Sequence, residues 1–215
     1  MLTVLRGALI ALEGIDGSGK STLAKNLSDY FTKEQVPTLL TKEPGGTLLG
    51  QQLRKILQMK TAPVSPKAEF LLFAADRAQH MQERIQPALK DKMLVLSDRM
   101  ADSAIAYQGY GRGLDIQKIR EVNAWAMNDV KPDITIYLRI DLETSLERIN
   151  KRNEALTAFE QEKKDFFQRV IAAFDELYKD RTDVIILDGH LSPDTLVKES
   201  AQKVIAWLKQ HQLLS

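Results

Sequence analysis

Short apolar runs alternate along the chain with segments in which apolar residues recur at helical spacing. A short run with few polar residues is typical of a strand that is buried on both faces of a parallel sheet. The pattern predicts strands at residues 8–12, 37–41, 93–96, 134–138 and 184–187. It predicts helices near residues 20–34, 47–58, 66–90, 115–129, 142–152, 160–179 and 192–210.

This alternation predicts an α/β fold, with a five-stranded parallel sheet, helices on both faces and right-handed crossovers. The length of 215 residues suits a single domain, which we place at residues 1–215. Residues 150–157 are polar and poor in β-branched residues, which favours a mobile flap. A solvated helix end is the alternative for that segment.

Residues 14–21, with the sequence GIDGSGKS, match the phosphate-binding loop pattern G-x-x-x-x-G-K-[ST]. Its glycines let successive backbone N–H groups turn inward around an anion, and a helix beginning near Lys20 adds the positive end of its dipole. Lys20 would then reach the β- and γ-phosphates, and the Ser21 hydroxyl would ligate Mg²⁺. The alternative is a glycine-rich turn that binds nothing. The strand before the motif and the helix after it argue against that alternative.

The charge and cysteine content limit the possible partners. Lys and Arg number 30 and Asp and Glu number 29, so the formal charge of +1 creates no global field for nucleic acid or a membrane. The absence of cysteine excludes disulfides and thiol catalysis and fits a reducing cytoplasm. The N-terminal apolar run leads directly into the phosphate loop, where cleavage of a signal peptide would destroy the site. We therefore expect a cytoplasmic protein with neither nucleic-acid nor membrane partners.

Two charged residues follow the third predicted strand. Asp98 lies where an acid beside a phosphate loop holds Mg²⁺, directly or through water. Arg99 would direct a planar fork of donors at phosphate oxygens, a geometry that lysine does not offer. An Asp–Arg pair that caps the next helix is the alternative.

Two further segments carry candidate binding groups. Residues 42–47 (KEPGGT) follow the second predicted strand, and Arg54 lies two helical turns further on. A plain strand-to-helix turn is the alternative for this segment. Phe70 and Phe73 share a helical face, and Arg77 follows Phe73 by four residues, so an aromatic ring and an arginine could together hold a flat base. Aromatic residues at helical spacing are also typical of a plain core.

Taken together, these segments resemble bacterial thymidylate kinase, and the resemblance covers almost the whole chain. It rests on residues 13–22 (EGIDGSGKST), 43–47 (EPGGT) and 71–80, and on Asp98-Arg99 followed by Ser103 and AYQG at 106–109. It implies transfer of the γ-phosphoryl group of MgATP to dTMP, giving dTDP and ADP on the route to dTTP for DNA replication. It also implies a nucleoside-monophosphate-kinase fold, and usually a homodimer.

The resemblance implies a role for each matching residue. The ATP phosphates would be held by Gly14, Ile15, Asp16, Gly17, Ser18, Gly19, Lys20, Ser21 and Thr22. The acceptor dTMP would be held by Asp16, Glu43, Arg54, Phe73, Arg77, Arg99, Ser103 and Gln108. Within the second set, Asp16 would bind the sugar 3′-OH, Phe73 would stack on thymine, and Arg77 and Gln108 would contact the edges of the ring. Arg54 and Arg99 would hold the acceptor phosphate, while Glu43 and Asp98 would organise the acceptor, the metal and its waters.

Members of the family that this chain resembles carry a catalytic arginine inside the phosphate loop or a catalytic cation on a lid. The loop here has no cation besides Lys20, so the resemblance implies that the cation comes from a lid at about residues 148–160. The candidates are Arg148, Lys151 and Arg152. Arg152 is the first choice because an arginine can bridge two phosphoryl oxygens where Lys151 offers a point charge. We expect Arg148 to lie near the adenine or the donor phosphates. The Asp-Arg pair that is usual in the family's lid is replaced here by Thr157-Ala158-Phe159.

Two other readings remain open from the sequence. The first is a different P-loop nucleoside-monophosphate or deoxynucleoside kinase, which a panel of acceptor nucleotides would distinguish. The second is a nucleotide-binding switch that hydrolyses its nucleotide slowly and has no acceptor. A second crevice rich in arginine argues against a switch, because a switch has no acceptor phosphate to hold.

Overall fold

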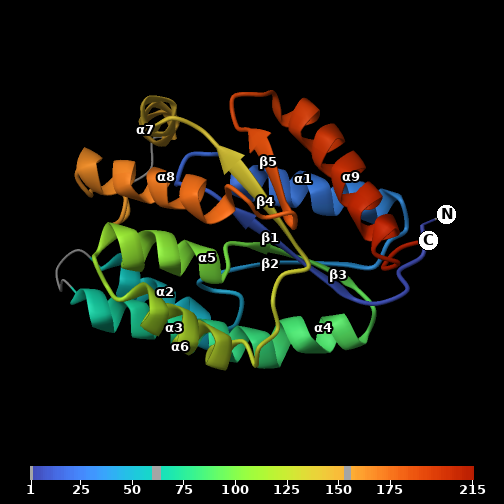
Figure 1. Cartoon of the computed structure of the whole chain (residues 1–215), viewed down its shortest axis with the longest axis horizontal. Coiled ribbons are helices and arrows are strands. Elements are labelled where there is room, and N and C mark those ends of the chain that lie inside the picture. The colour runs from blue at the N-terminus through green and yellow to red at the C-terminus, as the bar shows by residue number, and fades with distance from the viewer. Residues whose placement is uncertain (1, 60–63, 153–155) are drawn as a thin grey trace.

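The computed structural model describes residues 2–59, 64–152 and 156–215. Within these residues the sheet has five parallel strands in the order β2-β3-β1-β4-β5 (Figure 1). The strands are β1 (Ala8–Glu13), β2 (Thr38–Lys42), β3 (Leu94–Asp98), β4 (Ile134–Arg139) and β5 (Val184–Asp188). Each coincides with a strand predicted from the sequence, which confirms the α/β fold class.

The helices of the described residues are α1 (Lys20–Lys33), α2 (Leu48–Gln58), α3 (Pro66–His80), α4 (Gln86–Lys90), α5 (Ala101–Ala104), α6 (Ile116–Ala126), α7 (Leu142–Lys151), α8 (Lys164–Tyr178) and α9 (Pro193–Gln210). Two π-helical segments, η1 (Met81–Ile85) and η2 (Ile105–Gly111), join α3 to α4 and extend α5. The helix predicted at 66–90 is thus a run of three segments. The helix predicted at 160–179 begins only at Lys164.

The helical run at residues 101–111 was not predicted. Residues 103–109 are all buried, so this run has no polar face and its sequence shows no amphipathic period. Three of its polar side chains, those of Ser103, Tyr107 and Gln108, make hydrogen bonds to other side chains inside the protein. Burial on all sides therefore removed the signal on which the prediction of the other helices depended.

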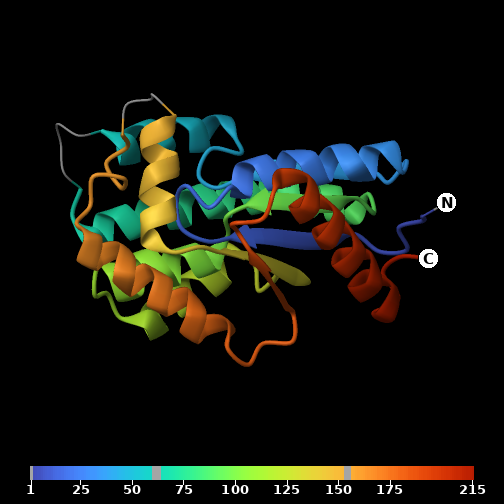
Figure 2. The ribbon, with the colours of Figure 1, turned by 90° about the horizontal axis from the view of Figure 1, so that it is seen from above.

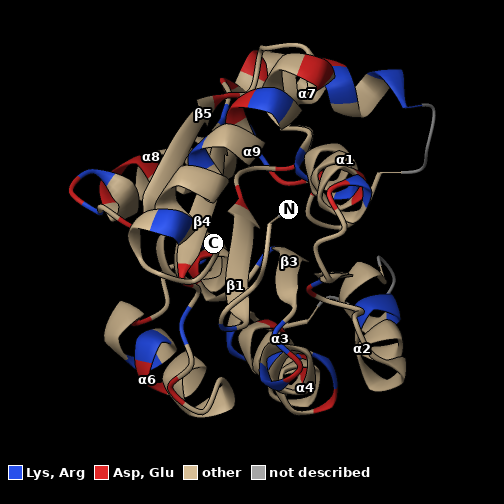
Figure 3. Cartoon of the chain, turned by 90° about the vertical axis from the view of Figure 1, so that its right-hand side faces the viewer, with Lys and Arg blue, Asp and Glu red and all other residues tan. Residues whose placement is uncertain are grey.

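Helices cover both faces of the sheet (Figures 1 and 2). Successive residues of a strand point to opposite faces, so Ile10 of β1 packs with α1 and α9 while Leu9 packs with η1 and α4. Tyr137 of β4 lies on the same face as Leu9 and packs with α8 and η2. Basic and acidic positions are interspersed over the helices (Figure 3), in line with the net charge. Among the described residues, no helix combines the length and apolar character of a membrane span.

The register of the sheet brings three strand ends together. The Cα atoms of Leu12 in β1 and Lys42 in β2 are both paired with Asp98 of β3. The phosphate loop after β1, the turn after β2 and Arg99 after β3 therefore begin at one edge of the sheet. Ligands of open α/β sheets bind at this carboxyl edge.

Candidate active site

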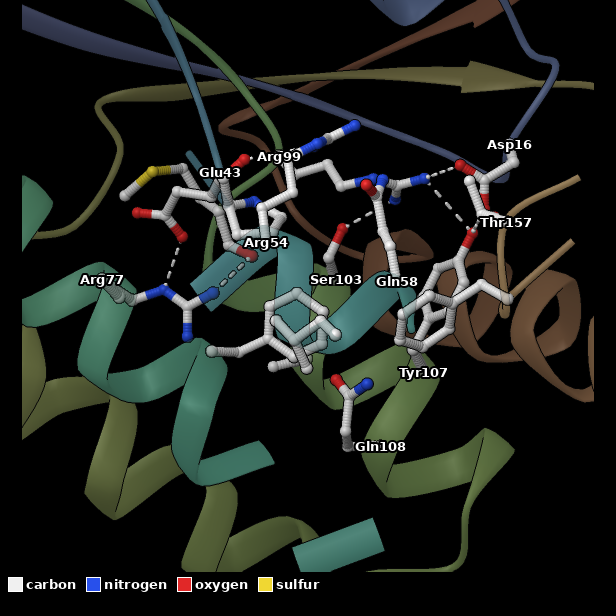
Figure 4. Close-up of a pocket in the computed structure, with 16 residues that line it drawn as sticks. Asp16, Glu43, Arg54, Gln58, Arg77, Arg99, Ser103, Tyr107, Gln108 and Thr157 are labelled. Atoms are coloured by element: carbon white, nitrogen blue, oxygen red, sulfur yellow. Dashed lines mark hydrogen bonds and ion pairs between the residues drawn. The ribbon is translucent and has the colours of Figure 1, made fainter. Parts of the chain in front are cut away.

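Two cavities adjoin at the carboxyl edge of the sheet. The first, which we call the loop cavity, has a volume of about 910 Å³ and is lined by residues that include Gly17, Lys20, Ser21, Asp98, Arg148 and Arg152. The second, the aromatic cavity, has a volume of about 120 Å³ and is lined by residues that include Phe73, Arg77, Ser103, Tyr107, Gln108 and Phe159 (Figure 4). The wall that the two cavities share consists of Asp16, Glu43, Arg54, Gln58, Arg99 and Thr157.

The phosphate loop needs its glycines. Gly14 and Gly17 adopt φ of 140° and 75°, in the region that side chains other than glycine rarely enter. A Cβ atom would lie 2.6 Å from the carbonyl oxygen of Leu138 at Gly14, and 2.6 Å from that of Ser145 at Gly17. The loop is thus closely packed against β4 and α7, and α1 begins directly after it at Lys20. This geometry directs a helix N-terminus at the loop cavity, where it favours an anion.

Lys20 supplies a buried positive charge to the loop. Its Nζ donates hydrogen bonds of 2.7 Å to the carbonyl oxygen of Ile15 and 3.4 Å to Oγ of Ser18. Burial and the neighbouring charge of Arg99 lower the pKa of Lys20 to about 8, although Asp16 raises it. Lys20 remains mostly protonated at neutral pH and can attract phosphate oxygens.

Ser21 and Asp98 lie side by side at the mouth of the loop. The Ser21 hydroxyl donates a hydrogen bond to Oδ2 of Asp98, so the two groups that were predicted as metal ligands lie together. No cluster of three or more His, Cys, Asp or Glu side chains that could hold a metal occurs in the described part of the chain. One carboxylate and one hydroxyl are hard oxygen ligands that suit Mg²⁺ held largely by water and substrate phosphates.

Arg99 connects the loop to the helical run at 101–111. Its guanidinium donates to the carbonyl oxygen of Gly14 at 3.0 Å. It also donates to Oδ1 of Asp16 at 2.7 Å and to Oγ of Ser103 at 3.0 Å (Figure 4). The Tyr107 hydroxyl donates to Oδ2 of Asp16 at 3.1 Å. Burial alone would raise the pKa of Asp16, but the charges of Arg99 and Lys20 outweigh it and hold that pKa below its usual value. Asp16 is therefore a fixed carboxylate on the wall between the cavities.

Glu13, the last residue of β1, is a site residue that the sequence reasoning did not assign. It is fully buried, and its carboxyl group accepts hydrogen bonds from the backbone N–H of Met100 at 2.8 Å and from the Ser103 hydroxyl. Burial, followed by the negative charge of Asp102, raises the pKa of Glu13 to about 7. Glu13 therefore orients Ser103, which in turn accepts from Arg99.

Arg77 is almost completely buried, with 2% of its side chain exposed. Its Nε donates to Oε2 of Glu43 at 2.8 Å, and its Nη1 donates to Oδ1 of Asn123 at 2.6 Å. The second oxygen of Glu43 contacts Nδ1 of His80 at 3.1 Å. Asn123 and His80 were not predicted as site residues, because they act through Arg77 and Glu43. His80 entered the sequence analysis only as the last residue of the segment 71–80. Arg77 lines the aromatic cavity with its position fixed by these partners.

Aromatic rings make up one wall of the aromatic cavity. The ring centroids of Phe73 and Phe159 are 5.9 Å apart, and those of Tyr107 and Phe159 are 6.3 Å apart. Phe159 and Tyr107 were not predicted as site residues; Phe159 was noted only as part of a departure from the family's lid. Arg54, which was predicted, reaches the shared wall and donates to the carbonyl oxygen of Pro44 at 3.1 Å (Figure 4).

The three basic residues near the end of α7 point in different directions. Arg148 lines the loop cavity, and its Nη1 donates to the carbonyl oxygen of Ser18 at 3.4 Å. Arg152 also lines that cavity and pairs with the buried carboxylate of Glu160. Lys151 is 77% exposed, pairs with Glu147 at 3.4 Å, and does not line either cavity. Residues 153–155 of the predicted lid lie outside the described residues.

Comparisons with known proteins agree on one family. Residues 12–200 match a family model described as thymidylate kinase. The thymidylate kinase of Halothermothrix orenii is 44% identical over 202 residues, which cover 93% of this chain and 97% of that protein. A thymidylate kinase of Staphylococcus epidermidis is 36% identical over 201 residues, which cover 93% of this chain and 98% of that protein. The crystal structure of thymidylate kinase from Ehrlichia chaffeensis has a TM-score of 0.73 at 32% identity, and the match covers 93% of this chain and 98% of that one.

Proposed function

The chain belongs to the thymidylate kinase family, and on that basis we propose that its two adjoining cavities hold the two substrates of one phosphoryl transfer. The enzyme is a phosphotransferase that moves the γ-phosphoryl group of ATP to dTMP, giving dTDP and ADP. The observation that carries the assignment is the shared wall of the cavities. A transferred group must pass between the sites, and the cations Arg54 and Arg99 lie on that wall.

The loop cavity is the proposed ATP site. The backbone N–H groups of residues 14–22 and the N-terminus of α1 would bind the donor phosphates, and Lys20 would reach the β- and γ-phosphates. Arg148 lies close enough to the loop to contact the donor nucleotide. Because the transition state of phosphoryl transfer is loose, positioning and charge stabilisation supply most of the rate.

Ser21 and Asp98 are the proposed holders of Mg²⁺. When bound, the ion would neutralise charge that develops between the β- and γ-phosphates. The contact between the Ser21 hydroxyl and the Asp98 carboxylate supports this assignment, since both groups offer oxygen ligands at one point. Lys20 lies one residue before Ser21, which keeps the proposed metal site beside the donor phosphates.

The aromatic cavity is the proposed dTMP site. Phe73 would stack on the base, and Arg77 and Gln108 would contact its edge. Arg54 and Arg99 would hold the acceptor phosphate on the wall that faces the loop cavity. Asp16 would accept a hydrogen bond from the sugar 3′-OH, while Glu43 fixes Arg77. Ser103 contributes by holding Arg99.

The lid remains the proposed source of a further catalytic cation. Arg152 is the best candidate because it lines the loop cavity, and on transfer it would exchange the Glu160 carboxylate for phosphoryl oxygens. Arg148 is the second candidate. Lys151 has the weakest support, since its side chain is exposed and lines neither cavity.

We also propose a homodimer in the cytoplasm. Leu71 of α3 and Trp125 of α6 are 52% and 82% exposed, and large apolar side chains in such positions are typical of protein interfaces. The absence of cysteine fits a reducing compartment. Light scattering coupled to size-exclusion chromatography tests the dimer; a monomer mass at micromolar concentration would refute it.

A coupled assay of ADP release tests the function directly. The wild-type enzyme is given ATP with dTMP, dUMP, dCMP or dGMP as the acceptor. We expect efficient saturable turnover with dTMP and much lower kcat/KM with dCMP and dGMP. Equal turnover of all four acceptors, or ATP hydrolysis that no acceptor stimulates, would contradict the proposed assignment of the aromatic cavity.

A further inference from the structure

The side-chain amide of Gln108 is held by a carboxylate on the neighbouring helix. Its Nε2 donates a hydrogen bond of 2.8 Å to Oε1 of Glu69, and both side chains are buried. Glu69 lies on the face of α3 that also carries Phe73 and Arg77, at successive spacings of four residues. One helix face thus carries the proposed stacking ring, the proposed base-contacting arginine and the partner of Gln108.

Arg112 fixes the Glu69 carboxylate in turn. Its Nε and Nη2 lie 3.3 Å and 3.1 Å from the two oxygens of Glu69, and its Nη1 donates to Oε1 of Glu162 at 2.6 Å. The guanidinium also lies 4.7 Å from the ring centroid of Phe166. A carboxylate that is paired with a guanidinium in this way accepts hydrogen bonds and donates none.

Glu69 therefore determines which way the Gln108 amide faces. The amide nitrogen must point to Glu69, because the reversed orientation would place the amide oxygen against the carboxylate. The amide oxygen and the second amide hydrogen are then left for a ligand in the aromatic cavity, toward which the Gln108 side chain points (Figure 4). Because Gln108 is buried and its amide nitrogen is held by a charged carboxylate, the amide has little freedom to turn over.

We infer that Glu69 is a positioning residue that makes the site selective for thymine over cytosine by fixing the orientation of the Gln108 amide. The inference rests on the proposed function, in which Gln108 contacts the edge of the base. Glu69 does not touch the substrate itself; it acts through Gln108.

The donor and acceptor pattern of the two bases gives the reason. Thymine presents an N3–H donor beside the O4 acceptor, and the fixed amide offers the complementary oxygen and N–H. Cytosine presents an N3 acceptor beside an N4 amino donor, the reverse pattern. The fixed amide would place oxygen against N3 and N–H against the amino group, whereas a reversed amide would suit cytosine. Uracil presents the same N3–H donor and O4 acceptor as thymine, so the Gln108 amide does not distinguish the two bases by the 5-methyl group.

The substitution Glu69→Gln tests the inference. Arg112 would take the single remaining side-chain oxygen, and the new NH₂ group would face Gln108 and favour its reversed orientation. We expect the ratio of kcat/KM for dTMP to that for dCMP to fall about tenfold or more, as buried polar groups set such discrimination. The ratio for dTMP to dUMP should not change. Loss of activity in equal proportion with all three acceptors, or an unchanged dTMP to dCMP ratio, would overturn the inference.

Two further variants distinguish a failure of the inference about Glu69 from a failure of the proposed role of Gln108. Glu162→Gln removes the other partner of Arg112 without touching Gln108, and should leave the dTMP to dCMP ratio at the wild-type value; a matching fall of that ratio would overturn the specific role of Glu69. Gln108→Ala tests the proposed function itself. If it leaves kcat/KM for dTMP unchanged, the base-contacting role of Gln108 fails, and the inference fails with it. If Gln108→Ala is impaired while Glu69→Gln keeps its selectivity, only the inference fails.

Discussion

Arg99 donates a hydrogen bond of 2.7 Å to Oδ1 of Asp16, and this contact joins the first residue after β3 to the middle of the phosphate loop. Both residues line both cavities. Arg99 adopts φ of 74°, a left-handed conformation that is uncommon for a residue with a side chain. Its partners on the loop and at Ser103 hold it there, so the cation is directed at the boundary between the two proposed substrates.

Arg99→Lys keeps the charge but loses the fork of donors. One ammonium group cannot contact Gly14, Asp16, Ser103 and a phosphate together. We expect kcat/KM for dTMP to fall about 100-fold, because the lost donors act on charge that develops during transfer. Steady-state kinetics with dTMP varied would measure this, with circular dichroism to confirm the fold. Near-wild-type kinetics in a folded variant would show that Arg99 serves structure alone.

Arg77→Ala should damage both stability and acceptor binding. It leaves the buried Glu43 carboxylate without its ion-pair partner, which typically costs about 3–5 kcal/mol of unfolding free energy. The KM for dTMP should rise far more than the KM for ATP. Arg54→Ala is the matched control, because among the described residues the Arg54 side chain makes a hydrogen bond only to the Pro44 carbonyl and forms no ion pair. It should weaken catalysis with little loss of stability. A rise of both KM values to the same extent in Arg77→Ala would contradict its role at the base.

Glu13 should make stability depend on pH. Its pKa is raised from 4.5 to about 7 in the folded protein, so the folded state binds more protons than the unfolded state between these values. Glu13 therefore contributes roughly 3 kcal/mol to the free energy of unfolding below pH 4.5, and this contribution is lost as the pH rises to about 7. Chemical denaturation of wild type and Glu13→Gln at a series of pH values measures it. Asp76, whose pKa burial raises to about 6, titrates in the same window in both proteins.

The expected result is a wild-type advantage over Glu13→Gln that shrinks as pH rises from about 4.5 to 7. Because Asp76 contributes equally to both proteins, it cancels in this difference. A difference that stays constant, or grows with pH, would contradict the raised pKa of Glu13.

Substitutions of Arg152 and Lys151 should have different effects on kcat. Arg152→Ala is expected to lower kcat by at least about tenfold at saturating ATP and dTMP, which is roughly 1.4 kcal/mol of barrier. Lys151→Ala is the control on the adjacent residue; its side chain is exposed, and kcat should stay close to wild type. If neither Arg152→Ala nor Arg148→Ala lowers kcat, the further cation does not come from this segment.

The fold was largely predictable from the sequence, and the site was predictable in part. The strands and the amphipathic helices were predictable from the periodic spacing of apolar residues. Residues 103–109 are all buried and show no such spacing, so the helical run at 101–111 was missed. The phosphate loop is a local motif. Asn123 contacts Arg77 across 46 positions of sequence, so only the folded chain shows the contact. Arg152 and Lys151 are adjacent in sequence, but only Arg152 lines the loop cavity and pairs with Glu160, which depends on where α7 ends and on the position of Glu160.

The central claim is that the loop cavity binds ATP and the aromatic cavity binds dTMP. Equilibrium binding of each nucleotide to wild type, Lys20→Ala and Phe73→Ala, measured by calorimetry, tests it most directly. Phe73→Ala should raise the Kd for dTMP roughly tenfold, through lost stacking, and leave the Kd for ATP nearly unchanged. Lys20→Ala should weaken ATP binding and leave dTMP binding nearly unchanged. If both variants weaken the same nucleotide, or weaken both nucleotides equally, the division of the substrates between the two cavities is wrong.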